Sequence, residues 1–558
     1  MISSILKIIS FEKKKIFFFF TILTIVVSLT EGFGIFLIYK LIGKELNFNF
    51  EFLKINNLND YILPIILIFF FFKFILLNIY SFVRNYLVTK FIERNGEILF
   101  KIYLNQNLIY YTLNNSSEFI RNIFNEVRVL ASCYDLFLKF LGETFVFIFL
   151  IGILFYFNFQ LTFSLFLVLL IISFLFIKLS KSRLKYFGRL NLQETKLVLN
   201  SLQEAFKAAR EMKIFSLDDF YLEKFKNSNC IIQKSSSRSA VVQEFPKNSF
   251  EFILVLLVFI FFLYGDIFIQ RENFLNPAFI VLIIFSALRL IPGSLRVVGF
   301  INSLSNSAPS INEIYLLVLK NKNKLIRNIK FNPFIFKKVI NFKNVSLKYP
   351  KQKYYVFKNL NIKILKNKKY LLKGESGFGK TSFVDILSGL LKPTRGQVLI
   401  DKKNIASLSK GWFNKISYMS QNSQLFDSSI LENITLQDYP LNINKQRLDN
   451  ALKISNSNKF IFSLPGRINY KVGENGQRLS GGQKQRVLLA RCLYKDADII
   501  ILDEFISAID EKNSKLILDL IKKIKNKTLI LIMHKYKKIG FVDYVIDFKK
   551  SKVNIKKN

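Results

Sequence analysis

Histidine and cysteine are nearly absent from this 558-residue chain, which contains one histidine, His534, and three cysteines. A single histidine excludes any metal site built from several histidines, and a histidine-assisted step must use His534. The cysteines, Cys133, Cys230 and Cys492, share no short spacing, so the sequence indicates neither a disulfide framework nor a zinc site.

Acidic residues are also scarce, since 39 Asp and Glu face 81 Lys and Arg and leave a formal charge of +42. No recognition motif of the usual nucleic-acid-binding families occurs, so we expect no nucleic-acid partner. We attribute the charge to a Lys-rich composition typical of an AT-rich genome and to cytosolic loops that face anionic membrane lipid.

Long apolar runs dominate the chain before about residue 300, and 51% of all residues are hydrophobic, including 62 Phe. A membrane-spanning helix needs about 20 apolar residues. The first run is too long for the apolar region of a cleaved signal peptide, so we expect a retained membrane helix. Six segments have the required length, near 15–42, 61–88, 136–157, 159–180, 248–270 and 277–300.

Basic residues are placed asymmetrically around these segments. Lys13, Lys14 and Lys15 precede the first span, and residues 178–247 are rich in Lys and Arg, whereas the opposite loops carry few. The positive-inside rule therefore predicts that both termini are cytoplasmic. We expect the protein to lie in the inner (plasma) membrane. The long segments 89–135 and 181–247 show helical periodicity, which predicts that the membrane helices continue into the cytosol and turn back there.

The charge and hydropathy change near residue 320 predicts two domains. Residues 1–320 are expected to form the membrane domain with its helical extensions, and 321–337 form a Lys- and Asn-rich linker. In residues 338–558, short β-rich runs alternate with helical stretches, as in an α/β domain.

Residues 374–381, Gly-Glu-Ser-Gly-Phe-Gly-Lys-Thr, match the P-loop pattern G-x-x-x-x-G-K-[ST] between an apolar run and a helical one. Glycines at a helix N-terminus let backbone N–H groups surround phosphates, so the motif predicts ATP binding. Lys380 would reach the β- and γ-phosphates and Thr381 would bind Mg²⁺. The predicted nucleotide-binding residues here are Gly374, Glu375, Ser376, Gly377, Phe378, Gly379, Lys380, Thr381 and Ser382.

A second apolar run, 499–502, follows Asp498 and ends in Asp503 and Glu504. After a P-loop, such a pair predicts that Asp503 binds Mg²⁺ and that Glu504 polarises the attacking water. Without the P-loop, a strand ending in two acidic residues would as readily be structural.

The segment Leu479-Ser-Gly-Gly-Gln483 precedes a helical run, so Ser480 and the amides of Gly481 and Gly482 are predicted to face an anion. This LSGGQ sequence resembles the signature of ATP-binding cassette (ABC) proteins, and residues 472–479 are similar to the exporter branch. The resemblance implies an α-helical transmembrane domain of six spans, of the type I exporter (type IV) kind, fused to an α/β P-loop ABC nucleotide-binding domain.

The same resemblance assigns roles to further residues. It implies that Tyr349 stacks on adenine, that Gln421 contacts Mg²⁺ and senses the membrane domain, and that His534 contacts the γ-phosphate. Glu504, His534 and Gln421 are thus the expected catalytic residues. The nucleotide-binding set also includes Ser480, Gly481, Gly482, Gln483 and, in the D-loop, Asp510.

Departures from the family pattern are small. Phe505 and Ile506 replace a Pro-Thr pair, and Ile509 replaces a Leu, but no catalytic group is lost. We therefore expect an active ATPase. In the family, each ATP is held between the P-loop of one cassette and the signature of the other, which implies a homodimer or a heterodimer with a second half-transporter.

The substrate is predicted from three stretches, within 115–127, 202–215 and 289–292, that resemble flippases of lipid-linked oligosaccharides. Lys73, Arg289 and Arg296 lie in or near predicted spans, where basic side chains are costly and would bind a diphosphate headgroup. The alternative is ion pairing between helices, for example with Glu31. An exporter of drugs, peptides or a lipid A-like lipid, and a non-transporting regulatory ATPase, are the other functions considered.

Overall fold

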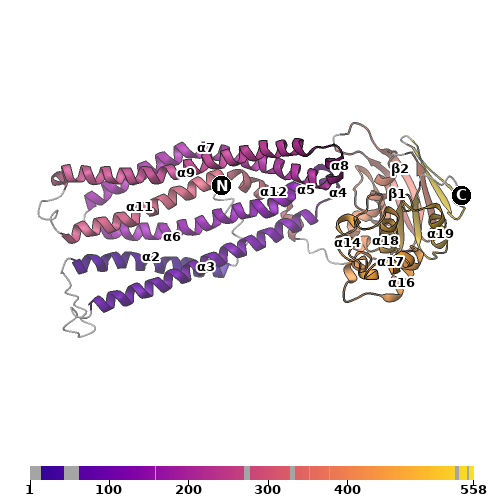
Figure 1. Ribbon diagram of the computed structural model, residues 1–558, viewed down its shortest axis with the longest axis horizontal. Coiled ribbons are helices and arrows are strands. Elements are labelled where there is room, and N and C mark those ends of the chain that lie inside the picture. Colours follow the sequence, from indigo (N-terminus) through magenta and orange to yellow (C-terminus); the bar gives the residue numbers. More distant parts are fainter. Residues whose placement is uncertain are drawn as a thin grey trace. The chain divides into compact units, whose positions relative to one another are not determined.

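The computed structural model describes residues 14–42, 62–157, 159–268, 277–326, 334–350, 352–375, 377–533, 540–549 and 552–557. They form two compact units (Figure 1). The first, a helical unit, comprises Met1–Gln106 and Tyr110–Arg327, and the second, the cassette unit, comprises Asn107–Ile109 and Asn328–Asn558.

Each of the six predicted spans corresponds to one long helix of the helical unit, apart from residues 61, 269 and 270, which lie outside the described residues. The longest but one, α7, has 49 residues, which is about 70 Å at 1.5 Å per residue, more than twice the hydrocarbon thickness of a bilayer. Helices α3, α7 and α9 continue well beyond their predicted spans, as the periodicity of the two long connecting segments indicated. The long helices are α2 (Lys14–Ile42), α3 (Ile62–Leu104), α6 (Val127–Phe157), α7 (Phe159–Lys207), α9 (Asp218–Phe268) and α11 (Pro277–Asn306).

Within the described residues, three stretches are long and apolar enough to cross a membrane: Lys15–Gly34, Ile66–Leu104 and Ser116–Phe155. Leu67, Ile68 and Phe71 on α3 are each more than 60% exposed, which suits contact with lipid rather than water. The count of six spans remains a prediction.

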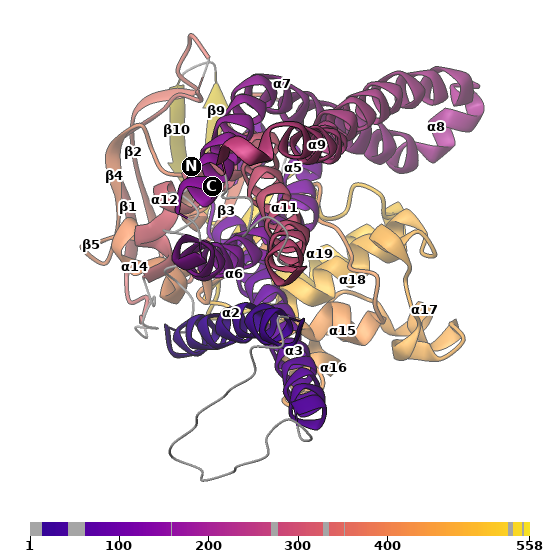
Figure 2. The same cartoon turned by 90° about the vertical axis from the view of Figure 1, so that its left-hand side faces the viewer.

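Short helices turn the chain back between the long ones. Between α3 and α6 lie α4 (Leu108–Leu113), α5 (Ser116–Arg121) and the π-helix η2 (Asn122–Glu126). α8 (Ala209–Ile214) lies at the tip of the α7–α9 hairpin (Figure 2). α12 (Ala308–Ile326) continues into the predicted linker 321–337, whose residues 327–333 fall outside the described part.

The cassette unit contains two sheets. In the larger, the strand order is β10-β9-β3-β8-β7-β6, and all strands except β10 are parallel. These strands are β3 (Lys369–Gly374), β6 (Ile416–Met419), β7 (Ile499–Asp503), β8 (Thr528–Ile532), β9 (Tyr544–Lys549) and β10 (Lys552–Lys557). Every residue of β7 and β8 is buried, as expected for strands covered on both faces.

The smaller, antiparallel sheet has the order β2-β1-β4-β5. Its strands are β1 (Val339–Leu347), β2 (Phe357–Leu365), β4 (Arg395–Ile400) and β5 (Lys403–Asn404). The cassette helices are α13 (Lys380–Ser388), α14 (Ile405–Phe413), α15 (Ile430–Thr435), α16 (Lys445–Ile454), α17 (Asn458–Ser463), α18 (Gly481–Tyr494) and α19 (Glu511–Lys522), with single 3-10 turns η3 (Leu436–Asp438), η4 (Arg467–Asn469) and η5 (Glu474–Gly476).

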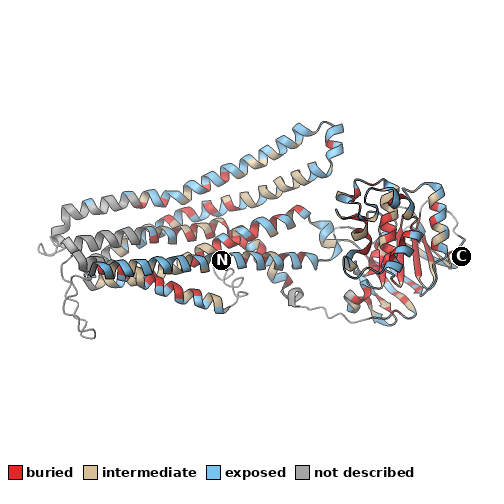
Figure 3. Cartoon of the chain, turned by 60° about the horizontal axis from the view of Figure 1, so that its bottom comes forward, coloured by how far each residue is buried: buried red, intermediate tan, exposed pale blue. Residues whose placement is uncertain are grey.

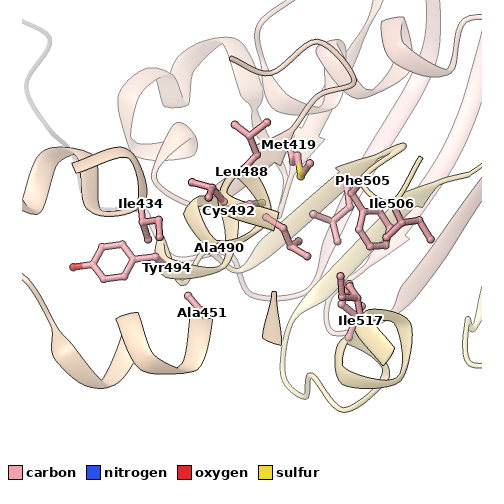
Figure 4. Close-up of a cluster of buried hydrophobic side chains, with 14 of the residues drawn as sticks. Met419, Ile434, Ala451, Leu488, Ala490, Cys492, Tyr494, Phe505, Ile506 and Ile517 are labelled. Atoms are coloured by element: carbon pink, nitrogen blue, oxygen red, sulfur yellow. The ribbon is translucent and has the colours of Figure 1, made fainter. Parts of the chain in front are cut away.

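Two apolar clusters form the cassette core, and buried residues concentrate there (Figure 3). One cluster surrounds α13 and includes the fully buried Trp412. The other lies around α18 and contains Phe505 and Ile506, which are 0% and 8% exposed (Figure 4). The two residues that depart from the family pattern therefore act as core side chains against α18.

Candidate active site

The sheet topology brings the predicted catalytic motifs to one edge. β3, β8, β7 and β6 are adjacent and parallel, so their carboxyl ends meet there. The P-loop follows β3, Asp503 ends β7, and Gln421 comes two residues after β6. His534 follows β8 in sequence but, like Ser376 of the P-loop, lies outside the described residues.

The P-loop backbone needs glycine at two positions for both conformation and space. Gly374 has φ +145° and Gly379 has φ +90°, values that side-chain-bearing residues avoid. A Cβ at Gly374 would lie 2.4 Å from the carbonyl oxygen of Phe548, and one at Gly379 would lie 2.5 Å from Cγ1 of Val356. At Gly377, φ is +85° but no atom lies within 4 Å of such a Cβ.

These differences predict unequal effects of alanine in one loop. Gly377→Ala should cost about 1 kcal/mol of conformational strain and leave ATP binding within about tenfold of wild type. Gly379→Ala adds a clash with Val356 and should abolish measurable ATP binding. Titration of each purified variant with a fluorescent ATP analogue checks this, with thermal unfolding as control. Equal affinities in the two variants would contradict the steric argument.

The ammonium of Lys380 is held inside the loop. It donates to the carbonyl oxygens of Gly374 at 2.7 Å and Glu375 at 2.9 Å, and the residue is only 7% exposed. Burial lowers the pKa of Lys380, and the negative charges of Asp503 and Glu504 oppose that shift. The two carboxylates are therefore close enough to Lys380 to stabilise its positive charge.

Tyr349 and Ser382, both predicted to bind nucleotide, are in direct contact. Their hydroxyl groups lie 2.9 Å apart, which ties the segment after β1 to the first turn of α13. Ser382 is buried, whereas its neighbour Thr381 is exposed on the same turn. Stacking of Tyr349 on adenine stays a prediction.

Asp503 is the buried carboxylate of the site, at 4% exposed. Burial, and secondarily the charge of Glu504, raise the pKa of Asp503 to about 6, although Lys380 opposes this shift. A divalent cation beside Asp503 would offset the cost of its charge. Thr381 and Gln421 add neutral oxygen donors, so the three predicted ligands fit Mg²⁺, which prefers hard oxygen atoms. In the described part of the chain, no group of three or more His, Cys, Asp or Glu side chains forms another metal site.

Glu504 and Gln421, each predicted separately as a catalytic residue, are in direct contact. The Gln421 Nε2 donates to Oε2 of Glu504 at 2.9 Å. Glu504 has φ +48°, in the left-handed region, and its N–H donates to the carbonyl oxygen of Ile532 on β8 at 3.0 Å. A residue other than glycine keeps this backbone conformation only where its surroundings fix it, and such positions cluster at functional sites.

The signature segment begins α18 with a capping box. Ser480 Oγ accepts from the N–H of Gln483 at 3.3 Å, and Oε1 of Gln483 accepts from the N–H of Ser480 at 2.9 Å. The Gln483 side chain therefore stabilises the helix start, a role that the Ser-x-x-Gln spacing could have revealed. The amides of Gly481 and Gly482 belong to the first turn, whose N–H groups have no acceptor within a helix.

Asp510 of the predicted D-loop caps α19. Its carboxylate accepts from the backbone N–H of Asn513 at 3.1 Å and from Nδ2 of Asn513 at 2.8 Å. These bonds lower the pKa of Asp510. Sequence reasoning missed Gln485, whose side chain contacts Ser507 and Ala508, the first two residues of the predicted D-loop (residues 507–510). Its position four residues after Gly481, on the same helix face, was the available signal.

The predicted substrate residues lie in the helical unit. Arg296 on α11 forms an ion pair with Glu143 on α6, with 2.8 Å between Nε and Oε1. For Arg296, the alternative of ion pairing between helices therefore applies. Lys73 on α3 lies 5.6 Å from the ring centre of Phe70. Arg289 belongs to α11, but its side chain falls outside the described residues.

Comparison with known proteins gives two family matches. Residues 17–291 match the ABC transporter transmembrane region, and residues 357–507 match the ABC transporter domain. A solved bacterial Atm1-family ABC exporter with ATP bound has the same fold, with a TM-score of 0.80 and 17% identity over 95% of this chain and 94% of that one.

Three curated relatives illustrate the range of similarity. The ABC transporter B family member 13 of Arabidopsis thaliana is 35% identical over 37% of this chain and 17% of its own length. The uncharacterized ABC transporter ATP-binding protein YknU of Bacillus subtilis is 28% identical over 66% and 62%. The chain thus spans less than two thirds of these two relatives. The ATP-dependent lipid A-core flippase of Alkalilimnicola ehrlichii is 24% identical over 81% of this chain and 76% of its own length.

The nucleotide-site geometry, the long helices and the two family matches lead to the same assignment. The chain belongs to the ABC transporter family: a helical transmembrane region is followed by an ABC transporter ATP-binding domain, and the fold is that of an ABC exporter.

Proposed function

We propose that this protein hydrolyses ATP and uses the energy to flip or export an amphipathic, anionic glycolipid across the inner (plasma) membrane. The substrate favoured is a polyprenyl-diphosphate-linked oligosaccharide. The observation that carries the ATPase part is the meeting of Lys380, Asp503, Glu504 and Gln421 at the ends of adjacent parallel strands.

In hydrolysis, Glu504 is the residue that would accept a proton from the attacking water, oriented by its hydrogen bond from Gln421. Lys380, already desolvated within the loop, would exchange its carbonyl contacts for phosphate oxygens. Thr381, Gln421 and Asp503 would hold Mg²⁺, which supplies neutralisation of charge on the transferred phosphoryl group.

The active form proposed is a homodimer, because half-transporters of this family usually dimerise and each chain carries one P-loop and one signature. ATP bound between the P-loop of one chain and Ser480 of its partner would close the cassettes. Closure would shift the helices from an inward- to an outward-facing arrangement through differential ATP affinity, and hydrolysis would reset them.

The glycolipid part of the proposal is supported by the similarity to the flippase of A. ehrlichii and by basic residues in the helical unit. Arg296 is paired with the carboxylate of Glu143, and its side chain remains 42% exposed, so a phosphate group can compete for it. Arg289 lies two helical turns earlier on α11 and so roughly on the same face.

Stimulation of ATP hydrolysis by lipid in proteoliposomes tests the substrate. A polyprenyl-diphosphate oligosaccharide should raise wild-type ATPase activity about threefold or more, since transported ligands favour the state that hydrolyses ATP. Arg289→Ala should lose this stimulation and keep basal hydrolysis. Arg94→Ala, at an exposed position of α3, is the matched control.

The other outcomes separate the alternatives. Stimulation by a lipid A-core lipid alone would favour the second candidate, a lipid A-type cargo, which the A. ehrlichii relative suggests. If neither lipid changes the basal rate of ATP hydrolysis, a drug or a peptide becomes the favoured substrate. Absence of hydrolysis by the wild type would indicate a regulatory protein instead.

A further inference from the structure

Gln485 connects the signature helix to the segment that follows β7. Its Nε2 donates to Oγ of Ser507 at 2.8 Å and, at a longer 3.4 Å, to the carbonyl oxygen of Glu504. Its Oε1 accepts from the N–H of Ala508 at 2.9 Å. A side-chain amide carries both a donor and an acceptor, so neither an acid nor an apolar side chain of equal size can make all three contacts.

These contacts complete the restraint of the Glu504 backbone. The N–H of Glu504 is bonded to Ile532 of β8, and the residues after it are held by Gln485. The left-handed φ of +48° persists only where the surroundings fix it. Because the backbone sets the direction of the side chain, the orientation of the Glu504 carboxylate depends on both the bond to Ile532 and the contacts with Gln485.

The glycines of the signature pack on the same segment. A Cβ at Gly482 would lie 3.1 Å from the carbonyl oxygen of Ala508, and one at Gly481 would lie 3.5 Å from Cβ of Ala508. Gln485 lies three and four residues beyond these glycines and therefore on the same face of α18. The start of α18 and the Glu504–Ala508 segment thus form one packed unit, with Gln485 as its polar connection.

We propose that Gln485 is a positioning residue, which transmits the position of the signature helix to the catalytic carboxylate of Glu504. This inference rests on the proposed ATPase homodimer. There, Ser480 serves the nucleotide held by the partner, whereas Glu504 serves the nucleotide on its own P-loop. Gln485 therefore links the two ATP sites: engagement of the signature at one site orients the carboxylate at the other.

The test compares Gln485→Met, which keeps the side-chain volume and removes the hydrogen bonds, with the same change at Gln446, an exposed residue of α16. In the full-length protein in proteoliposomes, Gln485→Met should lower kcat for ATP about 10- to 100-fold and leave KM within about threefold, because misplacement affects chemistry more than binding. Gln446→Met should match the wild type.

A second readout does not depend on turnover. Hydrogen exchange of residues 505–509 should be faster in Gln485→Met, since the Ala508 N–H loses its acceptor. Ser507→Ala should have a smaller effect on kcat, because Gln485 keeps its bond to Ala508. The double variant Gln485→Met with Ser507→Ala should be no slower than Gln485→Met alone, as expected for residues that act through one contact.

Wild-type kcat in Gln485→Met, a rise in KM alone, or unchanged exchange of 505–509 would each overturn the inference. A wild-type protein that does not hydrolyse ATP would contradict the proposed function instead. In that case the exchange measurement still decides whether Gln485 holds the segment, so the two failures are distinguishable.

Discussion

Glu504→Gln should lower kcat for ATP hydrolysis at least about 100-fold, while the affinity for ATP stays within about threefold of wild type. The substitution keeps the size of the side chain, and its amide oxygen can still accept the 2.9 Å hydrogen bond from Gln421. What is lost is the negative charge and the basic oxygen that takes a proton from water. A general base contributes about 10²- to 10⁴-fold to a rate, which sets the expected size of the loss.

Single-turnover hydrolysis and equilibrium binding of an ATP analogue, measured on the same preparation, check this prediction. Asp449→Asn, an acid-to-amide change at an exposed position of α16, is the matched control and should leave both quantities unchanged. Turnover near the wild-type rate in Glu504→Gln would mean that another group is the base. The ATP-bound protein should also remain dimeric for longer, because the step that opens the dimer is blocked.

Lys380→Ala should weaken ATP binding at least about 100-fold. Turnover is then lost because the variant no longer binds ATP. Lys380 is a buried residue, and its Nζ atom makes two charge-assisted bonds to the loop carbonyls of Gly374 and Glu375, which phosphate oxygens would replace. Such bonds contribute about 1.5–3 kcal/mol each, and about 1.4 kcal/mol corresponds to a factor of ten in the dissociation constant.

Titration calorimetry with a non-hydrolysable ATP analogue measures the effect. Lys453→Ala, which removes an exposed lysine from α16, should bind like the wild type. Thermal unfolding of Lys380→Ala without nucleotide shows whether the loop itself survives the loss of two bonds. An unchanged dissociation constant in a folded Lys380→Ala protein would contradict the assignment. Glu504→Gln and Lys380→Ala together separate failure of chemistry from failure of binding.

Several parts of the fold and site could be predicted because they depend on consecutive residues. Apolar runs of about 20 residues predicted the helical unit, and their helices continue beyond the spans as the periodicity indicated. The P-loop was predicted from its glycines, and positive φ at Gly374, Gly377 and Gly379 supplies the reason for them. The Ser480 cap of α18 is likewise a local device. The roles of His534, Ser376 and Arg289 stay predictions, since the first two residues and the Arg289 side chain fall outside the described part.

Other features could not be predicted, because they involve partners distant in the sequence. The signature pattern predicted Gln483 as a nucleotide contact, and the structure adds its use in a capping box. The partner of Arg296 is Glu143 on another helix, a choice that depends on how α6 and α11 pack. Gln485 had no predicted role, since an isolated glutamine on a helix is ordinarily a solvated residue.

The sequence by itself determined the local features: which runs are long and apolar, which loop carries the P-loop glycines, and which strand ends in the acidic pair Asp503 and Glu504. These are properties of neighbouring residues, whose backbone preferences and hydrophobicity act over one turn or one strand. The tertiary structure alone decided which segments meet. The order β3-β8-β7-β6 brings Gln421 to Glu504, and the packing of α18 on the residues after β7 brings Gln485 to Ala508. Strand order and helix packing follow from the burial of the whole apolar core, which no single motif encodes.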